Sequence, residues 1–200
     1  MKKYNMKIFE LDNISDFVPL KDGERRFDCI GGNKNFQVFL APEYMSRSEF
    51  MIQYKHILDP CLNPIFEDDD IVITQDARYA LPGFYIIATK TIQRTIAQLK
   101  FDVYKKCVFY QQTIANILED KYDFKSHLYY EEHYKKPAST HLWVLPLHEE
   151  VIKNNKLKIS IESLDVWKYL DVIPFSESRD KILEINNYMR EKLKEIKYEL

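Results

Sequence analysis

Ser139-Thr140-His141-Leu142-Trp143-Val144-Leu145-Pro146 is the segment on which the fold prediction for this chain rests. Its apolar and β-branched content predicts a strand. Because strand side chains alternate, Leu142 and Val144 lie on one face, and His141 and Trp143 lie on the other. A histidine in such a strand is most often half-buried and bonded to a backbone carbonyl. The rest of the chain decides whether this one carries chemistry.

The composition and net charge are typical of a globular protein. The chain has 200 residues, of which 46% are hydrophobic, which is enough for one domain with a sizeable core. A net charge of −2 gives no electrostatic reason to expect binding to nucleic acid or to an anionic membrane. The three cysteines form no Cys-x-x-Cys pair, which favours a reducing compartment over a disulfide framework. No apolar run approaches the ~20 residues of a membrane helix. We therefore expect a soluble cytoplasmic protein.

The first 61 residues predict an N-terminal extension of short strands and one capped helix, packed on the core. Gly31-Gly32-Asn33 separates two strand-like runs, which is a hairpin signal. Ser46 and Glu49 have the spacing of a capping box. The helix that follows is predicted to extend to about Leu58, where Asp59-Pro60 stops it.

The middle of the chain predicts an antiparallel sheet and a long helix. Residues 71–74 and 84–88 read as two paired strands. Residues 101–121 carry apolar side chains at helical spacing, with Cys107 on the apolar face as a core thiol. Asp76 follows the first strand and has two open roles: it caps the next turn, or it accepts hydrogen bonds from ligand hydroxyls. Local sequence favours capping.

The segments on either side of the quoted strand are more polar. His133, Lys135 and Lys136 lie in a basic loop that either cradles a phosphate or is a solvated charge cluster. Residues 149–200 form a C-terminal extension, with a short strand at 158–161 and a final helix that begins at Ser176 or Ser178. The apolar stripe of this helix packs on the sheet or on a second subunit.

The order of these elements resembles the histidine-triad (HIT) superfamily from about Leu62 to His148. HIT proteins carry an acidic turn, a strand, an aspartate, a proline-glycine turn, a second strand and, much later, the His-x-His-x-His strand. The matching residues here are Phe66-Glu67-Asp68-Asp69, Asp76, Pro82-Gly83, Phe84-Tyr85-Ile86-Ile87, Lys90 and His141-Leu142-Trp143-Val144-Leu145-Pro146.

This resemblance implies an α+β fold, in which a twisted antiparallel sheet has the long helix packed on one face. It also implies a nucleotidyl hydrolase or transferase that acts on a phosphoanhydride or related bond. His141 is then the nucleophile that forms a nucleotidyl-histidine. Asp76 binds the ribose, and Phe66, Ile71 and Ile73 line the base pocket. The mechanism requires no metal or cofactor, and HIT relatives often form homodimers.

Two triad positions depart from the family pattern. Ser139 stands at the first position and Trp143 at the last, where the family places a donor to the phosphate. An indole offers one N–H and no acceptor. Lys136 is a candidate replacement donor. His133, Lys135 and His148 are auxiliary candidates, although His148 faces away from His141 if the strand continues regularly.

Three functional interpretations remain open at this stage. The first is the HIT-like enzyme. The second is a degenerate HIT-like protein that binds a nucleotide or phosphorylated metabolite without turnover, which the loss of two triad positions favours. The third is a non-enzymatic interaction protein whose likeness to the family is accidental. Replacement of His141 by alanine separates the first two, and stabilisation by nucleotides separates both from the third.

Overall fold

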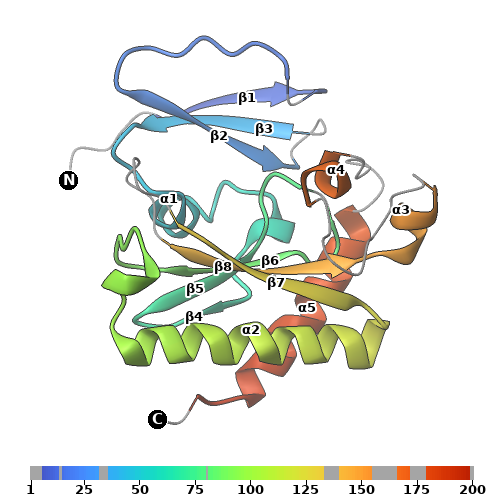
Figure 1. Cartoon of the computed structure of the whole chain (residues 1–200). Helices are drawn as coiled ribbons and strands as arrows, with labels where there is room; N and C mark the ends of the chain where they lie inside the picture. The colour runs from blue at the N-terminus through green and yellow to red at the C-terminus, as the bar shows by residue number, and fades with distance from the viewer. Residues whose placement is uncertain are drawn as a thin grey trace.

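The computed structural model describes most of the chain and arranges it around two antiparallel sheets (Figure 1). The described residues are 6–13, 15–31, 36–79, 81–132, 140–154, 166–171 and 179–198. The three-stranded sheet has the order β1-β3-β2, with bounds Lys7–Leu11, Phe36–Pro42 and Glu24–Ile30. The five-stranded sheet has the order β4-β5-β6-β8-β7, with bounds Phe66–Glu67, Ile71–Gln75, Tyr85–Thr89, His141–Leu147 and Lys125–Glu131.

The N-terminal segment forms the predicted hairpin and capped helix. Strands β2 and β3 pair antiparallel, with Ile30 opposite Phe36, across the predicted turn. In the capping box, the Glu49 N–H donates to Ser46 Oγ at 3.1 Å, and the Ser46 N–H donates to Glu49 Oε2 at 2.8 Å. Helix α1, Arg47–Gln53, ends five residues before the predicted Leu58, because the backbone leaves helical geometry at Tyr54 and continues in turns. A short 3₁₀ turn, η1, follows at Pro60–Leu62.

Helix α2, Phe101–Tyr122, covers one face of the five-stranded sheet, as the apolar spacing predicts (Figure 1). Another 3₁₀ turn, η2, precedes it at Ile96–Gln98. The core between α2 and the sheet contains Ile71, Ile73, Tyr85, Ile87, Cys107, Tyr110, Ile114, Leu118, Leu142 and Val144. Each buried isoleucine, leucine or valine in this set contributes about 1.5–3 kcal/mol through removal from water. Burial raises the pKa of the Cys107 thiol to about 12, so Cys107 is the predicted core thiol.

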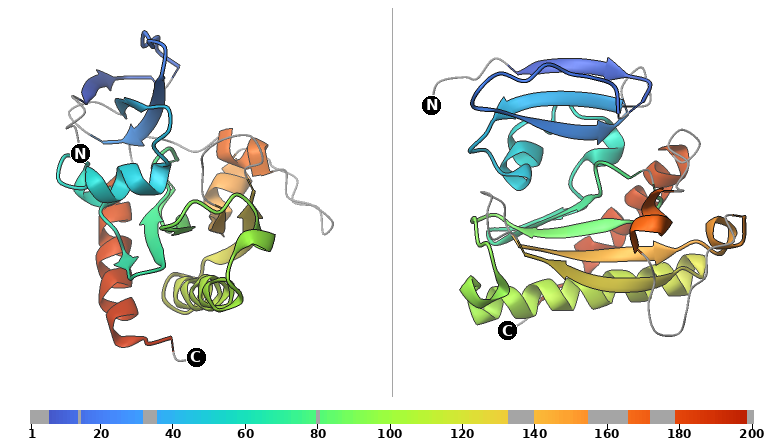
Figure 2. Two further views of the ribbon diagram at one scale, coloured as in Figure 1. Left: turned by 90° about the vertical axis from the view of Figure 1, so that its left-hand side faces the viewer. Right: turned by 45° about the horizontal axis from the view of Figure 1, so that its top comes forward.

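The alternation predicted for the quoted strand is present in β8. Leu142 and Val144 point into the core under α2, whereas Trp143 and Leu145 pack in a second cluster with Phe84 on the opposite face. The N-terminal sheet and α1 lie over that opposite face (Figures 1 and 2). The five-stranded sheet is therefore covered on both sides.

The C-terminal residues form three helices in the described part of the chain. These are α3, Glu149–Asn154, α4, Val166–Asp171, and α5, Arg179–Glu195. The apolar stripe of α5 packs into the core of its own chain through Ile182, Ile185, Met189 and Leu193. The predicted strand at 158–161 and the predicted helix starts at Ser176 and Ser178 lie outside the described residues. None of the described helices is long and apolar enough to cross a membrane.

A buried hydrogen-bond relay ties α5 to the sheet and to η1. Tyr85 Oη donates to Asn186 Oδ1 at 2.8 Å, and Asn186 Nδ2 donates to the Cys61 carbonyl oxygen at 2.7 Å. Asn186 is fully buried, so bulk solvent does not reach the side chain that makes both hydrogen bonds. The relay therefore fixes the rotation of α5 against the sheet.

Replacement Asn186→Ala is expected to lower the free energy of unfolding by about 2–3 kcal/mol, because it leaves a buried hydroxyl and a buried carbonyl without partners. Urea denaturation measures this change. The matched control is Asn187→Ala, one position along on the exposed face of α5, with an expected effect within about 0.5 kcal/mol. Equal effects of the two substitutions would contradict the role given to the relay.

Candidate functional site

A cavity of about 250 Å³ lies on the face of the five-stranded sheet that is turned away from α2. It brings together residues from β2, α1, β5, β6, β7 and β8, and from the turn after β5. The lining residues are Arg25, Arg47, Met51, Val72, Thr74, Gln75, Asp76, Ala77, Arg78, Tyr79, Ile86, Ala88, Glu131, His141 and Trp143. Three residues predicted from the sequence, His141, Asp76 and Trp143, are therefore neighbours in one enclosure.

His141 is the first residue of β8 and lies between two strands. It pairs with Ala88 of β6 on one side and with Glu131 of β7 on the other. Its Nε2 is 3.2 Å from Glu131 Oε2, and 18% of its side chain is exposed. A neutral imidazole that donates Nε2–H to a carboxylate keeps its lone pair on Nδ1. Glu131 thus orients the ring.

Asp76 is held in place by its own turn. Its Oδ1 accepts hydrogen bonds from the backbone N–H groups of Arg78 and Tyr79, both at 2.8 Å. The predicted capping role is confirmed, and the carboxylate also lines the cavity. Burial raises the pKa of the Asp76 carboxyl, whereas the charge of Arg47 and the two N–H groups act in the opposite direction. The second oxygen makes no hydrogen bond to the described residues, so its acceptor capacity is unused there.

Trp143 forms an aromatic wall between the cavity and the neighbouring apolar cluster. Its ring lies edge-on to Phe84, with centroids 5.4 Å apart, and edge-on to Tyr129 at 6.4 Å. Residue 143 shares the β8 face of His141, as the alternation predicts. Packing of this kind fixes the indole as a rigid surface beside the imidazole.

Two arginines from the N-terminal segment reach this cavity. Arg25 is on β2 and Arg47 is the first residue of α1. Their guanidinium carbons lie 4.6 Å and 5.3 Å from the centroid of the Phe27 ring. Arg78 adds a third guanidinium from the turn after β5. The cavity is thus a composite of the sheet and of the segment that covers it.

Several predicted site residues lie elsewhere. Ile71 and Ile73 are fully buried in the core under α2, because alternation along β5 turns them away from the His141 face. Val72 and Thr74, which alternate with these isoleucines along β5, line the cavity instead. Phe66 packs on Tyr110 of α2, with ring centroids 4.5 Å apart. The structure does not bring Phe66, Ile71 or Ile73 to His141.

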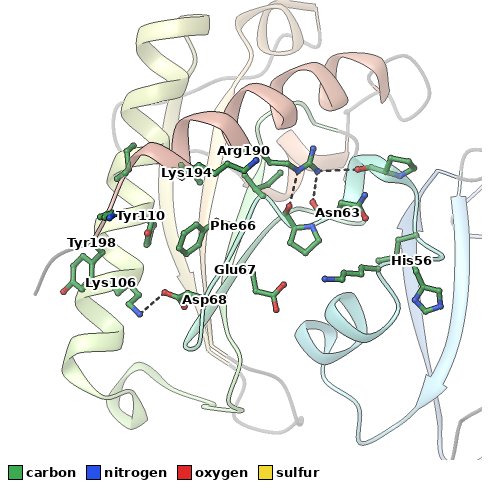
Figure 3. A pocket seen from close by; sticks show the side chains of 18 residues that line it. His56, Asn63, Phe66, Glu67, Asp68, Lys106, Tyr110, Arg190, Lys194 and Tyr198 are labelled. Carbon is green, nitrogen blue, oxygen red and sulfur yellow. Dashed lines mark hydrogen bonds and ion pairs between the residues drawn. The ribbon is translucent and has the colours of Figure 1, made fainter.

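Phe66 belongs to a second, larger depression of about 1100 Å³ between β4, α2 and α5 (Figure 3). Its acidic groups are already paired: Glu67 with Lys90 at 3.0 Å, and Asp68 with Lys106 at 2.9 Å. Arg190 donates to the backbone carbonyls of residues 63 and 64 at 2.9 and 3.1 Å. These contacts hold the loop against α5, so this depression is a less suitable reaction site than the one that holds His141.

The basic loop before β8 is not part of the described structure. His133, Lys135, Lys136 and Ser139 lie outside the described residues. Their assignment to a phosphate site stays a prediction from the sequence. In the described part of the chain, no group of three or more His, Cys, Asp or Glu side chains is arranged to hold a metal ion.

His148 lies away from the cavity. Its Nε2 is 2.9 Å from the Pro82 carbonyl oxygen, and its ring packs on Phe124 with centroids 4.2 Å apart. Burial lowers the pKa of His148, although the Pro82 carbonyl and the charge of Glu150 act in the opposite direction. The sequence prediction that a regular strand points His148 away from His141 agrees with this position.

Sequence reasoning missed Arg25, Arg47 and Glu131 as cavity residues. Glu131 lies opposite His141 in the β7–β8 register, so knowledge of that register is sufficient to find it. Arg25 and Arg47 carry no local signal, because only the packing of the N-terminal sheet over the larger one brings them to the site.

Solved structures with a similar fold include histidine-triad proteins. A zinc-bound histidine triad family protein from Mycobacterium smegmatis has a TM-score of 0.50 and 14% identity, over 73% of this chain and 94% of that one. A Hit-like protein involved in cell-cycle regulation from Bartonella henselae has a TM-score of 0.43 and 15% identity, over 68% and 94%. A HIT family protein from Bacillus anthracis has a TM-score of 0.43 and 13% identity, over 74% of this chain and 96% of that one.

At these identities the likeness concerns the fold alone, and only the first match has a TM-score that carries an argument. The chain has a HIT-like α+β fold, which confirms the predicted fold class. No protein-family model and no curated protein sequence matches the chain.

The lowered pKa of His148 predicts that stability decreases in mild acid. The unfolded chain, with an ordinary histidine pKa of 6.5, binds the proton more readily than the folded protein does. The stability that comes from keeping His148 neutral is fully present above the unfolded-state pKa of 6.5. It is lost as the pH falls below about 6.5 toward the lower pKa of His148 in the folded protein.

Urea denaturation between about pH 7.5 and pH 5 measures this loss in the parent and in His148→Gln, whose amide can still donate to the Pro82 carbonyl. We expect the stability advantage of the parent over the variant to shrink as the pH falls. A constant difference across the range would contradict a neutral, buried His148.

Proposed function

We propose that the His141 cavity binds a nucleotide and that His141 transfers the nucleotidyl group of that nucleotide through a covalent intermediate. One observation carries this proposal: His141 and Asp76, which the HIT resemblance pairs as nucleophile and ribose ligand, line one cavity in a HIT-like fold. The second carboxylate oxygen of Asp76 is suited to accept a hydrogen bond from a sugar hydroxyl. Met51, Val72 and Ala88 supply apolar surface for a base.

The proposed reaction has two displacements. An imidazole nitrogen of His141 attacks the α-phosphorus, a P–N bond forms, and the P–O bond to the leaving group breaks with its electron pair on that oxygen. Water or an acceptor phosphate then attacks the same phosphorus, and the P–N bond returns its electron pair to the imidazole. Attack through Nε2 requires Glu131 to move from its position at 3.2 Å, whereas attack through Nδ1 leaves that pair in place.

A second candidate function is nucleotide binding without turnover. The packing of Trp143 favours it, because that ring is held between Phe84 and Tyr129 and serves as a wall at the last triad position. Both candidates use the same cavity and the same nucleoside contacts. They differ only in whether His141 forms a bond to phosphorus.

Association of two copies through the edge of the sheet is a further part of the proposal, since HIT relatives often pair. Strand β7 is the edge strand next to β8, and its Leu128 and Tyr130 side chains are 46% and 65% exposed. Light scattering on the purified chain is expected to give twice the mass of the monomer, which is 24.0 kDa. Substitution Leu128→Lys should halve that mass. A monomeric parent would contradict the proposed dimer and would leave the proposed nucleotide site unaffected.

The enzyme proposal predicts that His141→Ala abolishes product formation. Parent and variant are incubated with dinucleoside polyphosphates, nucleoside phosphoramidates and nucleotide sugars, and products are separated by chromatography. Loss of a covalent nucleophile should lower kcat by about a thousandfold or more. The control is His127→Ala on the neighbouring strand, outside the cavity lining.

Unchanged turnover in His141→Ala would remove the covalent mechanism. No turnover by the parent, together with nucleotide-dependent thermal stabilisation that requires Asp76, would support the binding function instead. Absence of both turnover and stabilisation would contradict the nucleotide proposal altogether.

A further inference from the structure

Two arginines of the N-terminal segment, Arg25 and Arg47, form no ion pair with a carboxylate within the described residues. Arg25 donates to the Met45 carbonyl oxygen at 3.0 Å, and Arg47 donates to the Asp28 carbonyl oxygen at 3.3 Å. Within the described residues neither guanidinium has a carboxylate at ion-pair distance. Their neighbour Arg26 contrasts with them, since its Nε lies 2.5 Å from Asp28 Oδ1.

Partial burial makes it energetically unfavourable for Arg25 and Arg47 to lack a carboxylate partner. Both guanidiniums are partly buried and lie against the same Phe27 ring, so two like charges are held close together. Burial and the charge of Arg47 lower the pKa of Arg25, while Glu43 acts in the opposite direction. Each guanidinium carries five N–H donors, of which one described hydrogen bond uses one. A bound anion would relieve the repulsion and use the remaining donors.

The location of the pair relative to Asp76 limits what that anion is. Arg47 and His141 both act electrostatically on the Asp76 carboxyl, and all three line the same cavity. In the proposed function, Asp76 holds the sugar and His141 faces the 5′-phosphorus. Arg47 is therefore placed beside the sugar, and Arg25 extends the positive surface away from it.

We propose that Arg25 and Arg47 form a second anion subsite, which binds a phosphate carried on the 2′ or 3′ position of the sugar of the bound nucleotide. This inference rests on the proposed function of the His141 cavity. The substrate class is then a nucleotide with phosphates on both sides of its sugar. A phosphate monoester carries close to two negative charges, which matches two guanidiniums better than the carbonyl edge of a base does.

If Arg25 and Arg47 bind the second phosphate, the N-terminal segment takes part in substrate binding. It contributes binding groups as well as cover, and it selects substrates by a group remote from the reacting phosphorus. Interactions with remote groups position the reacting centre, so the second phosphate is expected to increase turnover as well as affinity.

Isothermal titration calorimetry tests the subsite. The parent is titrated with adenosine and guanosine 5′-monophosphates, and with the corresponding 2′,5′- and 3′,5′-bisphosphates. For each base, the better bisphosphate is expected to bind about tenfold or more tightly than the monophosphate. In Arg25→Gln and Arg47→Gln the ratio of bisphosphate affinity to monophosphate affinity should fall to about one, whatever change the substitution makes in the monophosphate affinity itself.

The matched control is Arg26→Gln, on the same strand as Arg25 but outside the cavity lining, which should retain the full advantage. Equal affinity of the parent for monophosphate and bisphosphates would overturn the subsite and leave the proposed function standing. An advantage that persists in both arginine variants would place the second phosphate elsewhere and overturn it too. Absence of binding by every nucleotide would remove the proposed function and this inference together. If one arginine variant fails to fold, the other arginine variant still tests the subsite, because each guanidinium is expected to contact the second phosphate.

Discussion

The strict alternation of side chains along β8 is the constraint on which the rest of the structure depends. β8 is hydrogen-bonded to β6 on one side and to β7 on the other, so its register is fixed twice. Leu142 and Val144 fill the core under α2, which leaves His141 and Trp143 on the opposite face. A shift by one residue would place the imidazole in the apolar core and turn two core side chains outward. The apolar packing of α2 therefore determines where the candidate nucleophile lies.

The second determinant is the cover over that face. In Figures 1 and 2 the three-stranded sheet and α1 lie above the larger sheet, on the side away from α2. Without this cover, His141 and Asp76 would stand on an open surface, where water weakens electrostatic interactions. With it, they line an enclosure to which the cover itself contributes Arg25, Arg47 and Met51. The proposed chemistry and the proposed second anion subsite thus both depend on a segment outside the HIT-like stretch read from the sequence.

Much of this architecture was predictable from local signals. The capping box at Ser46 and Glu49, the helical spacing within 101–121 and the turn chemistry at Asp76 are each set by neighbours a few residues apart, and each is present. The base-pocket prediction for Ile71 and Ile73 shows where local reasoning fails. Their faces follow from pairing with β6 and β8, which the sequence of β5 alone does not contain. Arg25 and Arg47 are harder still, because packing between two sheets places them, and no pattern in the sequence marks them as site residues.

The central claim is that His141 becomes covalently bound to phosphorus. Rapid quenching of the protein with a nucleotide substrate, followed by intact mass measurement and peptide mapping at neutral to alkaline pH, tests it directly, since phosphorus–nitrogen bonds of this type are labile to acid. We expect a mass increase equal to one nucleoside monophosphate on the peptide that contains His141, and we expect this adduct to disappear when the substrate is exhausted. A substrate that is turned over without any such adduct, or with the adduct on another residue, would contradict the account.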